Sequence, residues 1–298
     1  MSEANWLTEF PQMDRKDLLF IRKGLDGAYK EFSRAYGEII ENLFDPLLRF
    51  LVWFEKLLVN SPWWIIIAVL CSIVYSATRS VKLTIGVLIA FLLIGYFGMW
   101  ENTMRTMSII FVCTMISIAL GIPIGIMMSR SNRMQSIVTP ILDIMQTMPA
   151  FVYLIPVVML LGIGKVPGVI AVVIYAIPPV IRLTNLGIRL VDKEVLEAAT
   201  AYGANSTQRL FGVQLPLALP TIMAGINQTI MMALAMVVIA SMIGVKGLGQ
   251  PVLKSITNQY FTLGLFNGLA IVALAIVFDR VSQAYGKRTQ RHMEKAHQ

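Results

Sequence analysis

Long apolar segments constrain this chain of 298 residues more than any other feature of its sequence. A helix needs about 20 apolar residues to cross the hydrocarbon core of a bilayer. Seven segments have that character, although the first and the fifth are short: 63–78, 83–100, 106–128, 137–163, 166–182, 218–243 and 262–279. Only 14% of the residues are charged, against about 25% in soluble domains. The sequence therefore predicts an all-α integral membrane protein with about seven transmembrane helices.

The basic residues between these segments predict its orientation, because cytoplasmic loops carry an excess of Lys and Arg. Alternate loops divide these residues into two sets. The larger set is Arg79, Lys82, Arg130, Arg133, Arg182, Arg189, Lys193, Arg209, Arg280, Lys287, Arg288, Arg291 and Lys295. The smaller set is Arg105, Lys165, Lys246 and Lys254. The count places the 183–217 loop and a basic tail at 287–298 in the cytoplasm, and the N-terminus outside.

Residues 1–60 are expected to form an extracytoplasmic amphipathic region before the membrane domain at 61–286. No apolar stretch follows a basic start, so we expect no signal peptide. Apolar side chains recur at helical spacing from Phe32 to Leu58. Asp45-Pro46 suits a helix N-cap followed by the first helical position. The sequence thus predicts two consecutive helices, the second lying along the outer membrane surface. Packing of the apolar stripe on the protein's own spans explains the pattern equally well.

The rare reactive residues argue against an enzyme or a metal protein. Cys71 and Cys113 lie inside apolar segments, and His292 and His297 lie in the tail. No metal-ligand spacing and no pair of nucleophile and base is visible, so we expect neither a catalytic residue nor a metal site. An ion-coupled secondary transporter or a channel for small organic cations is the alternative function. Such a protein is expected to bury charges in its spans, where this sequence offers essentially only Asp143.

A short polar segment at 197–216 carries the most specific motif. It fits the pattern E-A-A-x3-G-x9-(I/V)-x-L-P through Glu197, Ala198, Ala199, Gly203, Val213, Leu215 and Pro216. Its small residues allow close approach of another protein, and the charged residues around it keep it out of the bilayer. The segment resembles the cytoplasmic coupling loop of ABC-importer permeases, in which a short helix docks on a partner ATPase. On that resemblance, Glu197, Ala198, Ala199, Gly203 and Pro216 are expected to contact the ATPase.

Residues 143–153 place polar groups inside an otherwise lipid-compatible run. Asp143, Gln146 and Thr147 precede Pro149, which frees backbone groups from helical hydrogen bonds. Such features are tolerated where protein or a water-filled cavity satisfies them. The candidate lining of a translocation path and gate is Met145, Met148, Phe151, Tyr153, Asn227 and Gln228. Ordinary packing of Met and aromatic side chains remains the alternative for each residue.

Beyond the coupling loop, residues 45–286 resemble the permease subunit of the glycine betaine/proline family of ABC importers. The stretches that carry the resemblance are LDIMQTMPAFVYL (142–154), GIGKVPG (162–168), PPVIRLT (178–184), PTIMAGINQ (220–228) and VVIASMI (237–243). The resemblance implies a type I ABC-importer permease fold in a bacterial cytoplasmic (inner) membrane. It also implies a homodimer of permeases, two ABC ATPases and an extracytoplasmic substrate-binding protein.

The same resemblance implies import of quaternary or methylated amine solutes such as glycine betaine, proline betaine, choline or trimethylamine N-oxide. Gly164-Lys165 is followed by Val166 where a phosphate-binding loop needs Ser or Thr, and the first glycine of that motif is absent. We therefore expect no ATPase site and no cofactor in this chain, with ATP and Mg bound by the partner ATPase. Membrane lipid is an expected partner, and nucleic acid is not.

Overall fold

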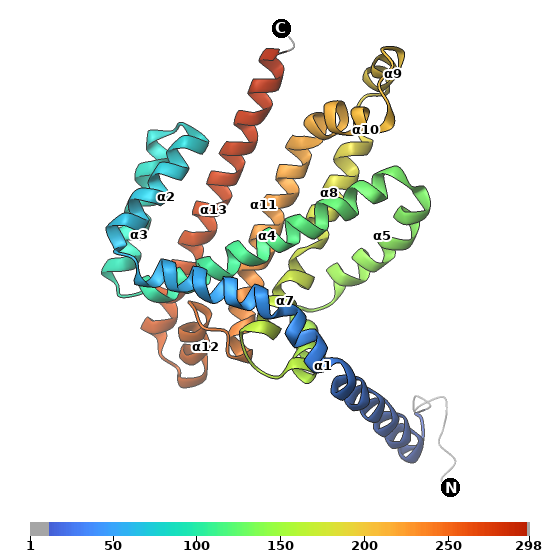
Figure 1. Ribbon diagram of the computed structural model, residues 1–298. Helices are drawn as coiled ribbons and strands as arrows, with labels where there is room; N and C mark the ends of the chain where they lie inside the picture. Colours follow the sequence, from blue (N-terminus) through green and yellow to red (C-terminus); the bar gives the residue numbers. More distant parts are fainter. Residues whose placement is uncertain (1–11, 297–298) are drawn as a thin grey trace, which may run out of the picture.

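The computed structural model describes the backbone of residues 12–296, and the side chains of these except residues 41 and 287–296 (Figure 1). Across these residues the fold is helical. The helices are α1 Arg15–Asn60, α2 Trp63–Thr78, α3 Val81–Tyr96, α4 Trp100–Arg130, α5 Asn132–Thr147, α6 Ala150–Leu161, α7 Lys165–Ala176, α8 Pro178–Arg189, α9 Lys193–Ala201, α10 Ser206–Arg209, α11 Leu215–Ala240, α12 Gly249–Asn258 and α13 Phe261–Ala296. A π-helix, Leu210–Gln214, precedes α11, and a 3-10 turn, Ser241–Ile243, follows it. In Figure 1, α9 and the end of α13 lie at one end of the molecule and α12 at the other.

Every predicted apolar segment is helical, but the segments differ in how they can cross a membrane. Among the described residues, four stretches are long and apolar enough alone: Trp100–Arg130, Lys165–Arg189, Ser206–Ile243 and Phe261–Gly286. Two further spans are possible as bent pairs, Asn42–Asn60 with α2 (109°) and α5 with α6 (100°). The segment predicted at 137–163 is thus two helices that meet at Pro149. That residue has no N–H to continue the α5 hydrogen bonds.

The predicted helix break at Asp45-Pro46 is wrong, because α1 is one helix of 46 residues with Pro46 in its interior. Asp45 does not cap a helix and instead pairs with Arg49 at 2.7 Å. An interior proline costs about 3 kcal/mol, and the packing that follows offsets this cost. Leu51 is fully buried and the ring of Phe54 lies 5.0 Å from that of Phe111 on α4.

The apolar stripe of α1 therefore divides into two parts. The C-terminal part, around Leu51 and Phe54, packs on the protein's own spans. In the N-terminal part, Phe32, Ile39 and Leu43 remain exposed. Packing therefore explains the part of the stripe after Pro46, and the position predicted for this part along the outer membrane surface stays a prediction.

The centre of the fold is α8, which packs between α4 and α11 through glycines. A Cβ atom on Gly121 of α4 would lie 2.4 Å from Val180 Cγ1, and one on Gly125 would lie 2.8 Å from the Ile181 carbonyl oxygen. On α11, a Cβ on Gly225 would lie 2.9 Å from Leu183 Cβ. Only glycine allows backbones to approach this closely. The Gly121–Gly125 spacing thus marks a real helix contact, and α8 joins the two helices into one unit.

Candidate functional site: a coupling segment, a bent span and an outer ion cluster

The coupling segment, residues 192–216, is built from local capping interactions. Asp192 caps α9 by accepting a hydrogen bond from the Glu194 backbone at 3.0 Å. Gly203 ends α9 with φ +82°, a left-handed conformation that glycine adopts without strain. Asn205 then starts α10 in a capping box with Gln208. The sequence thus specifies two capped helices joined by a turn here.

This segment projects from the body of the protein (Figure 1). No residue of α9 is buried, and Tyr202 is 94% exposed. An open groove of 400 Å³ runs beside α9, lined by Lys193, Leu196, Glu197, Thr200, Ala201 and Arg209. Arg209 closes the segment on itself by donating to Thr200 Oγ1 at 3.0 Å. The face left open includes the exposed ring of Tyr202, and tyrosine is enriched at protein interfaces.

The five residues predicted to contact the ATPase differ in how exposed they are. Glu197 and Ala198 are exposed on α9, whereas Ala199 is half-buried on the same helix. Gly203 lies in the exposed turn after α9, and Pro216 lies half-buried in the first turn of α11. Glu197, Ala198 and Gly203 are thus accessible to a partner, while Ala199 and Pro216 lie closer to the protein's own packing.

Arg130 joins the coupling segment to α4, and Arg189 joins the end of α8 to α4. Arg130 at the end of α4 donates to the Ser206 carbonyl oxygen at 3.2 Å. Arg189 at the end of α8 donates to the Met128 carbonyl oxygen at 2.8 Å and to Asn185 Oδ1 at 3.0 Å. The chain runs from α8 directly into α9, and from the π-helix directly into α11. The coupling segment is therefore continuous with two of the three helices of the glycine-packed centre.

The bent span α5–α6 brings some of the predicted path residues together. The Tyr153 hydroxyl donates across the bend to the Met145 carbonyl oxygen, and the Tyr153 ring packs edge-on to Tyr175 at 5.7 Å. Met148, just before the bend, packs against the main core. Phe151 differs from these residues, since 53% of it is exposed. Tyr153 thus stabilises the bend, and Phe151 is free to contact what lies outside it.

Asn227 and Gln228 on α11 do not join this group. Asn227 donates to Asp279 Oδ1 of α13 at 2.9 Å and accepts a hydrogen bond from Ser282. Gln228 is exposed. In the bent span, Asp143 forms an ion pair with Arg182 of α8. Asn227 therefore holds α11 against α13, and Asp143 holds α5 against α8.

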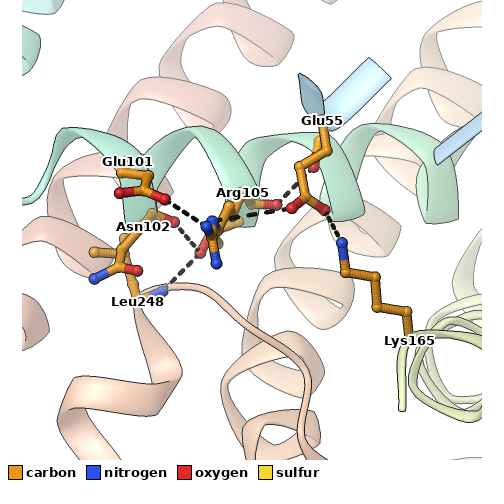
Figure 2. Close-up of polar contacts among 8 residues, drawn as sticks. Glu55, Glu101, Asn102, Arg105, Lys165 and Leu248 are labelled. Carbon is orange, nitrogen blue, oxygen red and sulfur yellow. Dashed lines mark hydrogen bonds and ion pairs between the residues drawn. The ribbon is translucent and has the colours of Figure 1, made fainter. Parts of the chain in front are cut away.

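A third polar group lies at the end of the molecule away from the coupling segment, and we call it the outer ion cluster for that reason; it consists of Glu55, Glu101, Arg105 and Lys165 (Figure 2). Glu55 is 8% exposed and its Oε2 accepts from Lys165 Nζ at 2.6 Å. Arg105 pairs with Glu101, and its Nε lies 3.9 Å from Glu55 Oε1. The cluster joins α1, α4 and the start of α7 through two acids and two bases.

The loop before α12 reaches the same turn of α4. The Leu248 backbone N–H donates to Thr106 Oγ1 at 2.9 Å. At Gly247, with φ +154°, a Cβ would lie 2.6 Å from that oxygen. Glu55 of α1, Lys165 of α7 and Leu248 before α12 thus meet around the first turns of α4.

Sequence reasoning missed the outer ion cluster because Arg105 and Lys165 were counted as loop charges. A signal was present in α1, where Glu55 interrupts the apolar stripe between Leu51 and Leu58. A carboxylate is almost never buried unless it is paired. An acid on the buried face of a helix therefore predicts a basic partner, although the sequence does not say which one.

Long apolar helices around a glycine-packed centre indicate a multi-pass membrane protein. Residues 117–291 match the family described as "Binding-protein-dependent transport system inner membrane component". The chain belongs to this family, as its resemblance to ABC-importer permeases predicts.

Its relatives support the same assignment. Over 298 residues it is 42% identical to the glycine betaine/proline betaine transport system permease protein ProW of Escherichia coli (strain K12), covering 95% of this chain and 83% of that protein. It is 49% identical over 259 residues to the glycine betaine transport system permease protein OpuAB of Bacillus subtilis (strain 168), covering 87% and 86%. The trimethylamine N-oxide transport system permease protein TmoV of Pelagibacter ubique (strain HTCC1062) is 36% identical over 228 residues, which cover 76% of this chain and 32% of that protein.

The fold also matches a solved structure described as an inward-facing conformation of the MetNI methionine ABC transporter. The TM-score is 0.57 at 20% identity, covering 62% of this chain and 93% of that chain. This likeness confirms the predicted all-α, type I ABC-importer permease fold.

Proposed function

We propose that this chain is the transmembrane subunit of an ATP-driven importer for quaternary and methylated amine solutes. Glycine betaine and proline betaine are the first candidates, and choline and trimethylamine N-oxide follow. Support for this substrate class comes from the names of relatives at 42% and 49% identity that span most of the chain. The observation that carries the coupling role is the exposed, capped segment α9–α10 at one end of the fold.

In this proposal the chain has no ATPase site, and a partner ATPase binds ATP and Mg. Two copies of the chain and two ATPases form the membrane complex, and a substrate-binding protein delivers solute from outside. The N-terminal region, 1–60, is extracytoplasmic, the membrane domain spans 61–286 with its coupling loop at 183–217, and the tail at 287–298 is cytoplasmic. Cysteines placed at Ser2 and Gln298, which lie outside the described residues, test this orientation. An impermeant thiol reagent added outside should label the first and not the second.

The contacts described above suggest how ATP-driven movement reaches the path. Closure of the ATPases draws the two coupling segments together, and each segment displaces the cytoplasmic ends of α8 and α11 as a rigid body. Arg182 of α8 pairs with Asp143 of α5, so α8 carries α5 and the bend beside Met145 and Met148 with it. Phe151, exposed after the bend, contacts the solute through weak cation–π attraction of about 0.5–2 kcal/mol. Asn227 and Gln228 line the neighbouring face of α11 in this scheme, with Asn227 also holding α13.

The decisive experiment tests the docking face of α9. Ala198→Trp adds a large ring to an exposed small position without disturbing internal packing, so it should abolish solute-stimulated ATP hydrolysis in proteoliposomes that contain all partners. Val81→Trp is the matched control, because Val81 is 59% exposed at the start of α3, beside the basic α2–α3 turn. Full coupling in Ala198→Trp would refute docking through this face.

The alternative function is an ion-coupled secondary transporter or a channel for small organic cations. It requires uptake in the absence of ATPase activity. Mutation of the phosphate-binding Lys of the partner ATPase separates the two functions, since it abolishes uptake by an ATP-driven importer and spares a secondary transporter.

A further inference from the structure

A large apolar cavity lies apart from the coupling segment and from the bent span. Its volume is 580 Å³, and it opens between the α2–α3 hairpin on one side and α4 and α13 on the other. Its walls include Ile66 and Leu70 of α2, Phe111 of α4, and Val277 and Phe278 of α13. Figure 1 shows the hairpin standing beside α13 and away from the α4–α8–α11 centre.

The ends of the hairpin place this cavity within the depth of the bilayer. Trp63 and Trp64 are exposed at the α1–α2 corner, and tryptophan favours the membrane–water interface. Arg79 and Lys82 mark the other interface at the α2–α3 turn. Between these ends the lining on α2 runs from residue 65 to residue 74, a rise of about 14 Å. The cavity is therefore elongated along the membrane normal.

The lining excludes polar occupants. A buried water needs two to four polar partners, and Ser61 at the corner is the one lining residue with a polar side chain. A methylated ammonium ion would lose its hydration without meeting a carboxylate, at a high desolvation cost. An empty space of this size would forfeit dispersion contacts along every wall. In a bilayer, the abundant molecules that match an elongated apolar space are lipid acyl chains.

We propose that this cavity binds one acyl chain of a membrane phospholipid, with the head group at the α1–α2 corner. There the indole N–H groups of Trp63 and Trp64 and the hydroxyl of Ser61 are available to the ester and phosphate oxygens. The chain extends between α2 and α13 and packs on residues 274–281. This stretch of α13 includes Asp279, which holds α11 through Asn227, so the lipid supports the helix that braces the core.

Photolabelling tests this site without any requirement for transport. The complete complex is reconstituted with a phospholipid that carries a diazirine in the middle of one acyl chain, and labelled peptides are mapped by mass spectrometry. Residues 66–74 and 274–281 should carry at least fivefold more label than the exposed face of α3. Val277→Trp, which fills the cavity from α13, should remove this excess, and Leu70→Trp should do so from the opposite wall.

The matched control is Ile89→Trp, because Ile89 is 51% exposed on α3 and lies outside the lining. It should leave the labelling of α2 and α13 unchanged. The proposal fails if the lining carries no more label than the α3 face, as annular lipid alone would give. It also fails if filled variants that still assemble with the ATPase keep the wild-type labelling of α2 and α13. The wild-type comparison stands even where a tryptophan variant does not assemble.

Discussion

Removing the carboxylate of Glu55 should destabilise the protein more than any other single change in the outer ion cluster. Breaking a buried ion pair by deleting one partner costs about 3–5 kcal/mol. Side chains of Lys165 and Arg105 are 27% and 23% exposed, so water partly solvates the orphaned cations. We therefore expect Glu55→Ala to lower the free energy of unfolding by about 2–3 kcal/mol. Lys165→Ala should cost about 1–2 kcal/mol, because Arg105 still faces Glu55.

The double variant Glu55→Ala/Lys165→Ala leaves Arg105 with its partner Glu101, so no charge is orphaned. Its cost should fall below the sum of the single costs by about 1–2 kcal/mol, a coupling energy typical of contacting groups. Unfolding in mixed micelles with increasing dodecyl sulfate, followed by tryptophan fluorescence, measures all three values. Glu38→Ala, at an exposed position of the same helix, should change stability by less than about 0.5 kcal/mol. Additivity of the two single costs would refute the pairing.

Four further variants test the coupling segment, the core and the path. Gly203→Leu places a side chain at φ +82°, which costs about 1–2 kcal/mol, and it should uncouple ATP hydrolysis from solute uptake. The control Gly212→Leu changes an exposed glycine without a positive φ and should uncouple far less. Equal uptake by the two variants would contradict the role of the turn at Gly203. Gly125→Val should prevent assembly of the folded permease, because even a Cβ would lie 2.6 Å from Thr184 Cβ. A normal size-exclusion profile of this variant would contradict the prediction, because it would show that α4 and α8 can move apart. Phe151→Ala should raise solute leak or slow solute uptake in sealed proteoliposomes. Tyr153→Ala should have the same effect and should also destabilise the bend between α5 and α6. Normal transport by both variants would place the gate elsewhere.

Sequence patterns predicted the parts of this fold that depend on local chemistry. The apolar segments are helices, because apolar runs of this length satisfy their backbone within the helix. The polar motif after residue 192 became two capped helices, because Asp192, Gly203 and Asn205 act within a few residues of themselves.

The errors arose where distant packing outweighs local preference. Asp45-Pro46 is a good helix start by itself, yet Leu51 and Phe54 bury against α4 and α7 and keep α1 continuous. Among the path candidates, the exposure of Phe151 and the bond from Asn227 to Asp279 depend on which helices lie alongside. The residue pattern of a single segment does not show which helices lie alongside it in the fold.

The unbroken length of α1 makes it a lever. Glu55 holds one end of this helix, and near its middle Gly37 lies so close to α6 that a Cβ would be 3.3 Å from the Leu160 carbonyl oxygen. Between that contact and Arg15 the helix rises about 33 Å. A displacement of α6 that tilts this part of α1 therefore moves Arg15 farther than the contact itself. Rearrangement of the bent span inside the membrane thus becomes a larger sweep at the far tip of this helix, where a single spin label can record it.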